Sequence, residues 1–598
     1  MLINEIYSGF NQVLILLHRL KTRAFKALHL VFFTIFLLLS AQISFAAEDL
    51  LTPDAGQILR QIERDLEVKP LPALPELPSQ APVIEETQAE LVLIKHFKFT
   101  GNHVLAEDEL AAALAPLTNR SISITELKTC TDLVAALYHQ KGYLATATLP
   151  EQDITEGEVL INIVEAVFGG VKFDGSYHKD FKRVKPQVIE RYILGNSPKG
   201  VVLNQENLDR GLQLLEGLSG IKVESALQAG EQVGTTDLLV KVKDQPLLSA
   251  NALLDNSGGR QTGRNKLTAT LAVASPLGYG DSLHLTALHA EGTDYGRIAY
   301  TLPVGSRGLQ VGVNGTYMQY NIIKEFSTQN ANGYSSSVGL NARYPLYSNK
   351  TSKLNISVDA DMKSFTNLAT TGVVEGKTSD YRLNVYAFTL SGEHSDRVLA
   401  GAQNTASINL GGGTVNLNGS LNQADDLAAA RTDGSFARLR WNLTRNQFFT
   451  DTVSLSLSGS GQLANSNLDS SEKFYLGGVS GVRAYPSSEG SGSEGYLVVA
   501  ELRKYLPHNL TVSTFVDYGH VTQYARNQNT LGNVISTLND YDLKGYGVAL
   551  GWQGPYNTNV KAIYAHRIGS NPNPTANGND QDGSKRYNVF WLSGGVSF

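Results

Sequence analysis

The sequence predicts a transmembrane β-barrel that follows two small α/β domains, and composition and periodicity predict the barrel. Of the 598 residues 42% are hydrophobic and only 18% are charged, with 56 glycines. After the N-terminal segment, no stretch stays apolar over the roughly 20 residues that a spanning helix needs. From about Leu248 to the C-terminus, apolar and polar side chains alternate, which is the period of a β-strand. A large soluble β-protein has a similar composition and is the alternative.

Residues 1–46 are predicted to be a secretory signal peptide. Four basic residues precede the apolar run 30–39, namely Arg19, Lys21, Arg23 and Lys26. Ser44-Phe-Ala46 then supplies a small-x-small cleavage pattern. A retained anchor helix is the alternative, and the short apolar run argues against it. The mature protein therefore leaves the cytoplasm, and a β-barrel destination implies the outer membrane of a Gram-negative cell.

Residues 47–67 contain a short amphipathic helix, and residues 68–90 form a linker. The helix is predicted over 54–67, with an apolar side made of Ile58, Leu59, Ile62 and Leu66. Five prolines in the linker predict an extended, semi-rigid chain. Because a helix of this length is not stable alone, it must dock on something or stay disordered. Docking on a surface is the ordinary expectation, and plugging a pore is the sharper one.

Residues 91–167 and 168–245 repeat one order of elements, β-α-α-β-β. The first unit is predicted to have strands at 93–99, 145–149 and 159–164 and helices at 105–117 and 124–140. The second is predicted to have strands at 170–173, 221–227 and 237–242 and helices at 186–194 and 204–218. Such repetition indicates an array of binding modules. Each module has a sheet edge that could accept an added strand.

Residues 246–598 are predicted to form the barrel. Strands of roughly ten residues, joined by short turns on one side and long loops on the other, fill this length with about 14 to 18 strands. In the last strand Phe590, Leu592, Val596 and Phe598 share one face. We expect this terminal strand to close the barrel, with Phe598 as a signal for barrel insertion. A soluble sandwich or β-helix would also alternate, with shorter segments.

Two motifs near the C-terminus are predicted to meet. Residues 475–486 place Arg483 in a Gly-rich segment between two strands, and residues 515–519 place Asp517 on a strand. Asp517 faces the lumen if the apolar face of that strand meets lipid. A lone carboxylate in a partly desolvated lumen is costly, and a guanidinium is its natural partner. The alternative is an exposed loop cation and a solvated lumen acid.

From about residue 52 onward the chain resembles the outer-membrane transporters of two-partner secretion (TpsB, the haemolysin secretion/activation type). Segment 54–60 resembles the family's N-terminal helix, and 99–102, 142–143 and 150–157 resemble its first POTRA domain. Segments 255–263 and 276–281 resemble its first barrel hairpin. Val482-Arg-Ala-Tyr485 resembles the VRGY signature of the sixth extracellular loop, and 515–519 the FxDxG signature. Ala484 stands where the family commonly has Gly, so the loop tip is expected to differ slightly.

The resemblance implies two periplasmic POTRA domains (91–167 and 168–245), a 16-stranded barrel (246–598) and a resting pore plugged by the N-terminal helix. Loop 474–497 would fold into the lumen. The transport and gating residues would be Val482, Arg483, Ala484, Tyr485, Phe515, Asp517 and Gly519. The implied partner is one large exoprotein of the adhesin, cytolysin or contact-toxin type, captured unfolded and exported without nucleotide hydrolysis. Outer-membrane lipids, and the barrel assembly machinery during biogenesis, are further expected partners.

Other functions remain alternatives. An outer-membrane assembly factor of the same superfamily usually carries more POTRA domains and lacks a plug helix, and a passive porin leaves residues 91–244 unexplained. No constellation of catalytic residues predicts an enzyme, and no cofactor is expected. Residues 372–378 are one residue too short for a phosphate loop. His284 and His289 fall on opposite strand faces, so no metal site is expected. The net charge of −6 argues against nucleic acid. Cys130 is the only cysteine and is predicted to be a small buried hydrophobe.

Overall fold

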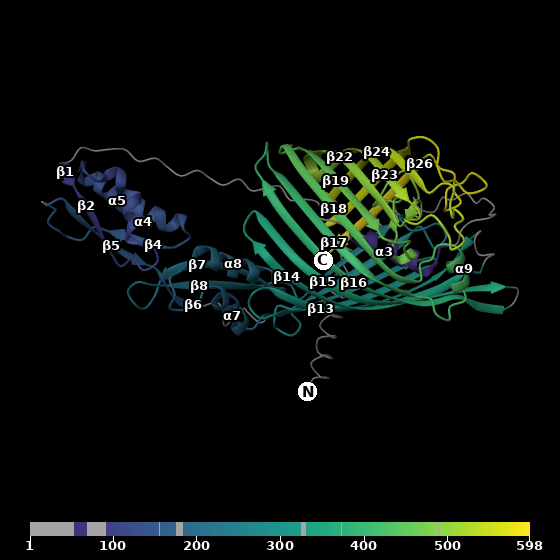
Figure 1. The fold of residues 1–598 in the computed structure, drawn as a ribbon, viewed down its shortest axis with the longest axis horizontal. Coiled ribbons are helices and arrows are strands. Elements are labelled where there is room, and N and C mark those ends of the chain that lie inside the picture. The colour runs from purple at the N-terminus through teal and green to yellow at the C-terminus, as the bar shows by residue number, and fades with distance from the viewer. Residues whose placement is uncertain are drawn as a thin grey trace, which may run out of the picture.

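The computed structural model describes residues 53–67, 91–154, 156–174, 183–324, 330–371, 374–487 and 489–598. The predicted signal peptide (1–46) and Pro-rich linker (68–90) lie outside these residues. The described chain consists of a helix, two α/β units and a closed β-barrel, with the second unit lying between the first unit and the barrel (Figure 1). None of the helices in these residues has the length and apolar character needed to cross a membrane.

The first α/β unit has the predicted elements with one difference at its start. Its three-stranded sheet has the order β2-β5-β4, and the helices pack on it over a core that includes Cys130. Its elements are β1 (Leu91–Ile94), β2 (His96–Thr100), α4 (Glu107–Leu114), β3 (Arg120–Ser123), α5 (Ile124–Gln140), β4 (Ala145–Thr148) and β5 (Glu158–Glu165). Burial raises the pKa of the Cys130 thiol to about 11, which makes it an unreactive core residue.

The prediction of a single strand over 93–99 is wrong, because the strand is interrupted at Lys95. The backbone N–H groups of Lys95 and His96 both donate to the carbonyl of Gly157, at 2.6 and 3.2 Å. This shared acceptor bends the strand into β1 and β2, and β1 pairs with β3, which was not predicted. By contrast, α5 has the predicted bounds, because Ser123 and Glu126 form a capping box at its start.

The second unit repeats the order of the first and lies against the barrel. Its elements are β6 (Val167–Phe173), α7 (Pro186–Asn196), α8 (Gln205–Glu216), β7 (Ile221–Ala229) and β8 (Thr235–Asp244), in a sheet of order β6-β8-β7. The helices touch several short turns of the barrel. Asn196 Nδ2 donates to Ser306 O at 3.1 Å, and Ser348 Oγ donates to Gln213 Oε1 at 2.8 Å.

The barrel of the described chain closes from 16 antiparallel strands, as predicted. Their bounds are β9 (Leu248–Asp255), β10 (Lys266–Ala274), β11 (Ser282–Ala290), β12 (Thr293–Val304), β13 (Leu309–Asn321), β14 (Asn332–Ser348), β15 (Ser352–Thr371), β16 (Val374–Asp396), β17 (Ala402–Asn416), β18 (Gly434–Thr450), β19 (Val453–Ala464), β22 (Glu494–Leu506), β23 (Leu510–Thr522), β24 (Asp540–Gly554), β25 (Thr558–Arg567) and β26 (Asn588–Ser597). Short turns lie at the end that the second unit contacts, and most of the connections at the other end are longer.

The C-terminal residue takes part in the closure of the barrel. The backbone N–H of Phe598 donates to Ala250 O at 2.8 Å, and Ala250 N–H donates to Phe598 O at 3.2 Å. Phe590 and Phe598 are exposed on the outside, whereas Leu592 and Val596 are almost fully covered. All four residues occupy alternate positions of the strand as predicted, and the exposed apolar area of this face lies mainly on its two phenylalanines.

Asp281 builds the turn on which the second unit rests. It is fully buried, and it accepts hydrogen bonds from the Leu277 and Tyr279 backbone N–H groups at 3.1 Å each and from the Tyr300 hydroxyl at 2.8 Å. In the same turn a Cβ on Gly280 would lie 2.8 Å from Leu218 Cβ of the second unit, so only glycine permits this approach. Segment 276–281, which resembles part of the family's first barrel hairpin, therefore forms a turn that contacts the second unit.

We expect Asp281→Ala to loosen the second unit from the barrel. Two backbone N–H groups and one hydroxyl, all in partly buried hydrogen bonds, would lose their acceptor, at about 0.5–1.5 kcal/mol for each bond. Spin labels on the second unit and on the barrel should show a broader distance distribution in double electron–electron resonance. Tyr300→Phe is the control, since it removes one bond and should cost only about 0.5–1.5 kcal/mol. An unchanged distribution in Asp281→Ala would contradict this role.

Candidate functional site

A long loop between β19 and β22 folds back into the barrel. Its described part contains the 3-10 helix Ser470–Glu472 and a small antiparallel pair, β20 (Phe474–Tyr475) with β21 (Ser491–Gly492). The predicted loop bounds of 474–497 are wrong at the C-terminal end, because β22 begins at Glu494. Residues from Gly495 onward pair with β19 and belong to the barrel wall.

Arg483 of this loop is bound by two carboxylates of the barrel wall. Its Nε and Nη2 donate to the two oxygens of Asp517 on β23, at 3.0 and 2.7 Å, and its backbone N–H donates to the same carboxylate at 3.0 Å. Its Nη1 donates to Glu501 on β22 at 2.8 Å. Arg483 is 5% exposed and Asp517 is fully buried. Such a bidentate, charge-assisted pair fixes the loop strongly in place.

Two aromatic residues complete the environment of Arg483. The guanidinium carbon lies 3.3 Å from the centre of the Phe515 ring, and Trp591 Nε1 on β26 donates to the Arg483 carbonyl at 2.8 Å. Sequence reasoning predicted Phe515 and Asp517 but not Glu501 or Trp591. Glu501 is an acid on an inward position of β22, opposite Phe515 in the strand register. Glu501 could not be predicted as a partner of Arg483 without this strand register.

The other predicted loop residues pack into the same cluster. Val482, Ala484 and Tyr485 are buried, and a Cβ on Gly519 would lie 2.6 Å from Leu476 of the loop. Ala484, the departure from the family signature, faces Gly545 on β24, where an added Cβ would lie 2.6 Å from the Ala484 Cβ. The extra methyl group in the loop is therefore accommodated by a glycine in the wall.

The amphipathic helix lies inside the barrel. Helix α3 (Ala55–Leu66) lies within the predicted range of 54–67, and Asp54 is its N-cap. Ile58, Leu59 and Ile62 are buried, and Leu66 is partly buried. They pack against apolar side chains of the inner wall and the loops, namely Leu288, Tyr295, Met318, Tyr320, Ile322, Phe365, Tyr381, Leu383, Val385, Val415, Leu417, Phe436 and Leu468. The barrel thus provides an internal apolar surface for this helix.

Polar contacts join α3 to both the wall and the loop. At its N-terminus the Ser470 hydroxyl donates to Asp54 at 2.7 Å, and Ala55 N–H donates to Asn367 Oδ1 at 2.9 Å. Near its C-terminus Arg64 donates to the carbonyls of Tyr475 and Gly477, both at 2.7 Å. The helix is therefore hydrogen-bonded both to the loop and to the barrel wall.

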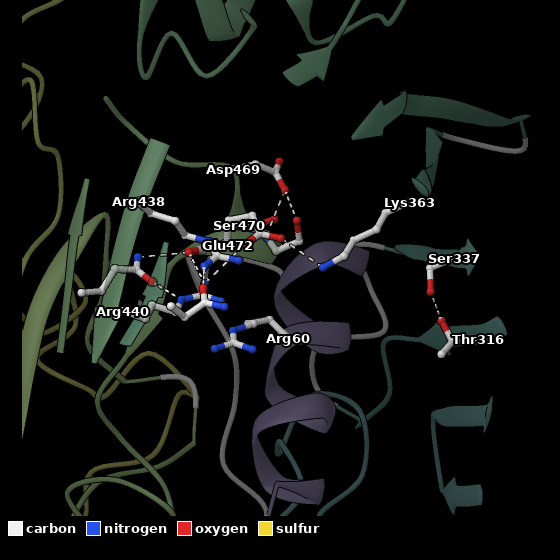
Figure 2. A network of polar contacts seen from close by, with 12 residues as sticks. Arg60, Thr316, Ser337, Lys363, Arg438, Arg440, Asp469, Ser470 and Glu472 are labelled. Carbon is white, nitrogen blue, oxygen red and sulfur yellow. Dashed lines mark hydrogen bonds and ion pairs between the residues drawn. The ribbon is translucent and has the colours of Figure 1, made fainter. Parts of the chain in front are cut away.

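A second buried charge network lies beside the helix (Figure 2). Glu472 of the loop is 1% exposed and pairs with Lys363 of β15 at 3.0 Å and with Arg438 and Arg440 of β18 at 2.8 and 3.4 Å. Arg60 of α3 lies close to these groups (Figure 2). Sequence reasoning missed Glu472, because its partners lie on strands far from it in the chain.

A cavity of about 1470 Å³ lies beneath the helix, on the side that carries Arg60, Glu63, Arg64 and Glu67. Its walls are formed by residues of strands β10–β19 and β22 and by residues of the loop. Within the described residues no group of three or more His, Cys, Asp or Glu side chains is placed to bind a metal ion. The arrangement is a polar vestibule closed on one side by the helix and the loop.

Comparison with known families decides the class of this protein. The family model for haemolysin secretion/activation proteins ShlB/FhaC/HecB matches residues 234–553, and the model for the ShlB-type POTRA domain matches residues 92–166. The chain belongs to the haemolysin secretion/activation family. The first α/β unit of this family member is a ShlB-type POTRA domain, and its barrel is that of an outer-membrane transporter of two-partner secretion.

Similarity to individual proteins supports the same family assignment. The heme/hemopexin transporter protein HuxB of Haemophilus influenzae is 24% identical over 527 residues, covering 85% of this chain and 90% of HuxB. The outer membrane transporter CdiB of Dickeya dadantii is 22% identical over 475 residues, covering 76% of this chain and 81% of CdiB. The solved structure of CdiB from Escherichia coli has the same fold, with a TM-score of 0.69 at 18% identity, and covers 92% of this chain and all of that one. The chain is therefore an outer-membrane protein with its POTRA domain in the periplasm.

Proposed function

We propose that this transporter takes one large, unfolded exoprotein from the periplasm and passes it through its barrel to the cell surface without nucleotide hydrolysis. The observation that carries the proposal is an amphipathic helix docked inside a closed barrel, beside a vestibule lined largely by polar residues of the inner wall. Residues 168–245 act as a second POTRA domain beside the barrel entrance. The partner is of the adhesin, cytolysin or contact-toxin class.

Capture would use the free sheet edges of the two α/β units. In the described part of the chain strand β7 pairs with β8 alone, and its residues from Glu224 to Ala229 are exposed. An extended cargo segment can add to such an edge through backbone hydrogen bonds, with side chains giving little selectivity. Strand β4 of the first unit is likewise an edge of its sheet. We propose these two edges for the first contact with the partner.

Two further contacts are proposed for the barrel, one of its outer face with membrane lipids and one of its closing strand with the barrel assembly machinery. Exposed apolar side chains such as Val338, Leu340 and Val358 form a surface that suits outer-membrane lipids. We propose that Phe598, at the end of the closing strand, is recognised by the barrel assembly machinery. Removal of Phe598 should then reduce the amount of assembled barrel rather than the transport rate of the barrels that form.

Lys266 of β10 can exchange partners when the helix leaves. Its Nζ lies 2.8 Å from Asp65 of the helix and 3.7 Å from Asp255 of β9, and all three side chains are nearly buried. Asp255 is itself held by the Ser257 backbone N–H at 2.8 Å. Departure of Asp65 therefore leaves Lys266 beside a fixed carboxylate, which avoids an uncompensated buried charge.

Two neutralising substitutions at this site should act in opposite directions. Asp65→Asn weakens a charge-assisted bond of about 1.5–3 kcal/mol and should raise the open fraction about tenfold or more in planar-bilayer conductance. Asp255→Asn removes the replacement partner and should lower that fraction. Asp294→Asn, an exposed carboxylate paired with His289, is the control. A change in the same direction for both lumen variants would exclude partner exchange.

The export function is tested by deleting the gene in its host. Proteins of the medium, the cell surface and the periplasm are then compared by mass spectrometry. Loss of one very large surface or released protein, restored by the gene on a plasmid, is the expected result and identifies the partner. A broad fall in many barrel proteins would instead indicate an assembly factor. No change under expressing conditions would leave a passive porin.

A further inference from the structure

The vestibule beneath the helix has one charged side and one uncharged side. The charged side consists of helix α3, with Arg60, Glu63 and Arg64, and of strands β14 and β15, with Arg343, Asp359, Asp361 and Lys363. The uncharged side is the inner face of β16–β19, made of Thr389, Ser391, Thr405, Ser407, Asn409, Asn442, Thr444, Asn446, Ser456, Ser458 and Ser460. The limits of this hydroxyl and amide wall are marked by charged residues, namely Glu393 on β16, the two arginines bound to Glu472 on β18 and Arg503 on β22, the strand that pairs with β19.

The strand register makes this wall continuous. Ser407 of β17 lies opposite Asn442 of β18, which lies opposite Ser460 of β19. In the next inward row, nearer the short turns, Thr405, Thr444 and Ser458 are paired in the same way. Because paired residues on neighbouring strands point to the same face, these rows form one surface.

Several hydroxyl groups on this wall have no partner among the residues that the structure describes. Ser456 is only 8% exposed and lines the vestibule, yet its hydroxyl makes no hydrogen bond within the described residues. The hydroxyls of Ser458 and Ser460 also make none there. None of these three hydroxyl oxygens is fully buried, so they can bond to water in the vestibule and are available to a guest that displaces this water.

An extended polypeptide has the chemistry that matches this wall. Each of its residues carries a backbone donor and acceptor that must be satisfied once it leaves bulk water. Short hydroxyl and amide side chains can serve any sequence, and each bond is weak enough to exchange as the chain advances. Charged groups would retain oppositely charged residues of the passing chain, and an apolar wall would retain hydrophobic ones.

We propose that the hydroxyl and amide wall of β16–β19 is the track along which the exported polypeptide moves. This inference rests on the proposed export function and deepens it by naming the side of the lumen that binds the cargo. The vestibule is present while α3 is docked, so the cargo can occupy the track before the helix leaves. The helix contacts β13, β14 and β15, so a cargo chain on β16–β19 would lie beside it along the neighbouring part of the wall.

Site-specific photo-cross-linking tests the track. The probe is the partner identified by the deletion experiment, fused at its C-terminus to a tightly folded domain that stalls it in transit. A benzophenone amino acid replaces Ser458 on the track or Asn341 on β14, which lines the charged side of the same vestibule. Adducts with the stalled partner are expected at position 458 and largely absent at 341. Equal yields at the two positions, or adducts at 341 alone, would overturn the proposal.

A charge substitution gives an independent readout. Ser458→Arg should cause loss of most export while the assembled barrel remains at wild-type amount, whereas Asn341→Arg should export normally. Export by Ser458→Arg at the wild-type rate would overturn the track but leave the export function intact. If wild-type cells export no partner in the deletion experiment, the proposed function itself fails first, so the two failures are distinguishable.

Discussion

Arg483→Ala is expected to abolish most export while leaving the barrel assembled. The substitution leaves Asp517 and Glu501 as buried carboxylates without the guanidinium that joins them, and removing one member of such a group costs about 3–5 kcal/mol. The barrel is stabilised by the hydrogen bonds between its strands. The lost free energy therefore mainly weakens the docking of the loop that crosses the lumen. Secreted partner per assembled barrel is the measurement, with heat-dependent gel mobility to count folded barrels.

Matched variants separate the role of the site from a general effect of charge. Arg483→Lys keeps the charge but loses the bidentate geometry with Asp517, and should restore export only in part. Arg445→Ala is the control, since it removes an arginine that pairs with Asp396 at 2.7 Å in a half-exposed setting, where a pair is worth about 0–1 kcal/mol. Normal export by Arg483→Ala would remove the Arg483–Asp517 pair from the mechanism.

Deletion of residues 54–67 should raise the ion conductance of the purified protein in planar bilayers. The deletion removes the helix from the lumen and leaves the vestibule continuous with the space that the helix occupied. Ile62→Asp should act in the same direction without shortening the chain. Burial of an isoleucine contributes about 1.5–3 kcal/mol, which corresponds to roughly a tenfold or larger shift in the docking equilibrium.

The control for the helix is Gln61→Ala, because the Gln61 side chain makes none of the hydrogen bonds that dock α3. Its conductance should equal that of the unmodified protein. Conductance that does not change on deletion of residues 54–67 would mean that the helix does not occlude the resting pore, and the loop carrying Arg483 would then be the main barrier.

Much of the architecture could be predicted because periodicity is a local property of the chain. Alternation from Leu248 predicted the barrel, and its length allowed the 16 strands that the structure has. The two β-α-α-β-β units were predicted from their repeated order of elements. The interruption of the first strand at Lys95 could not be predicted, because it depends on the carbonyl of Gly157. That carbonyl comes close to the strand only when the unit is folded.

The candidate site was predicted only in part, for a related reason. Arg483 and Asp517 could be paired from sequence, since one buried charge requires another and the motifs suggested both. Glu501 and Trp591 lie on other strands, and Glu472 meets Lys363 and Arg438 across the lumen. A shift of one residue in strand register would turn each of these side chains to the opposite face of the barrel.

The sequence by itself determined the amphipathic helix, the repeated units, the alternating strands and the charged residues that a lumen would have to pair. Closure of the barrel decided the rest. It fixed the register that gathers Asp517, Glu501 and Trp591 around Arg483, and it placed an apolar inner surface under Ile58, Leu59 and Ile62. Contacts between residues hundreds of positions apart depend on the order and stagger of all the strands between them. No local pattern in the chain contains that information.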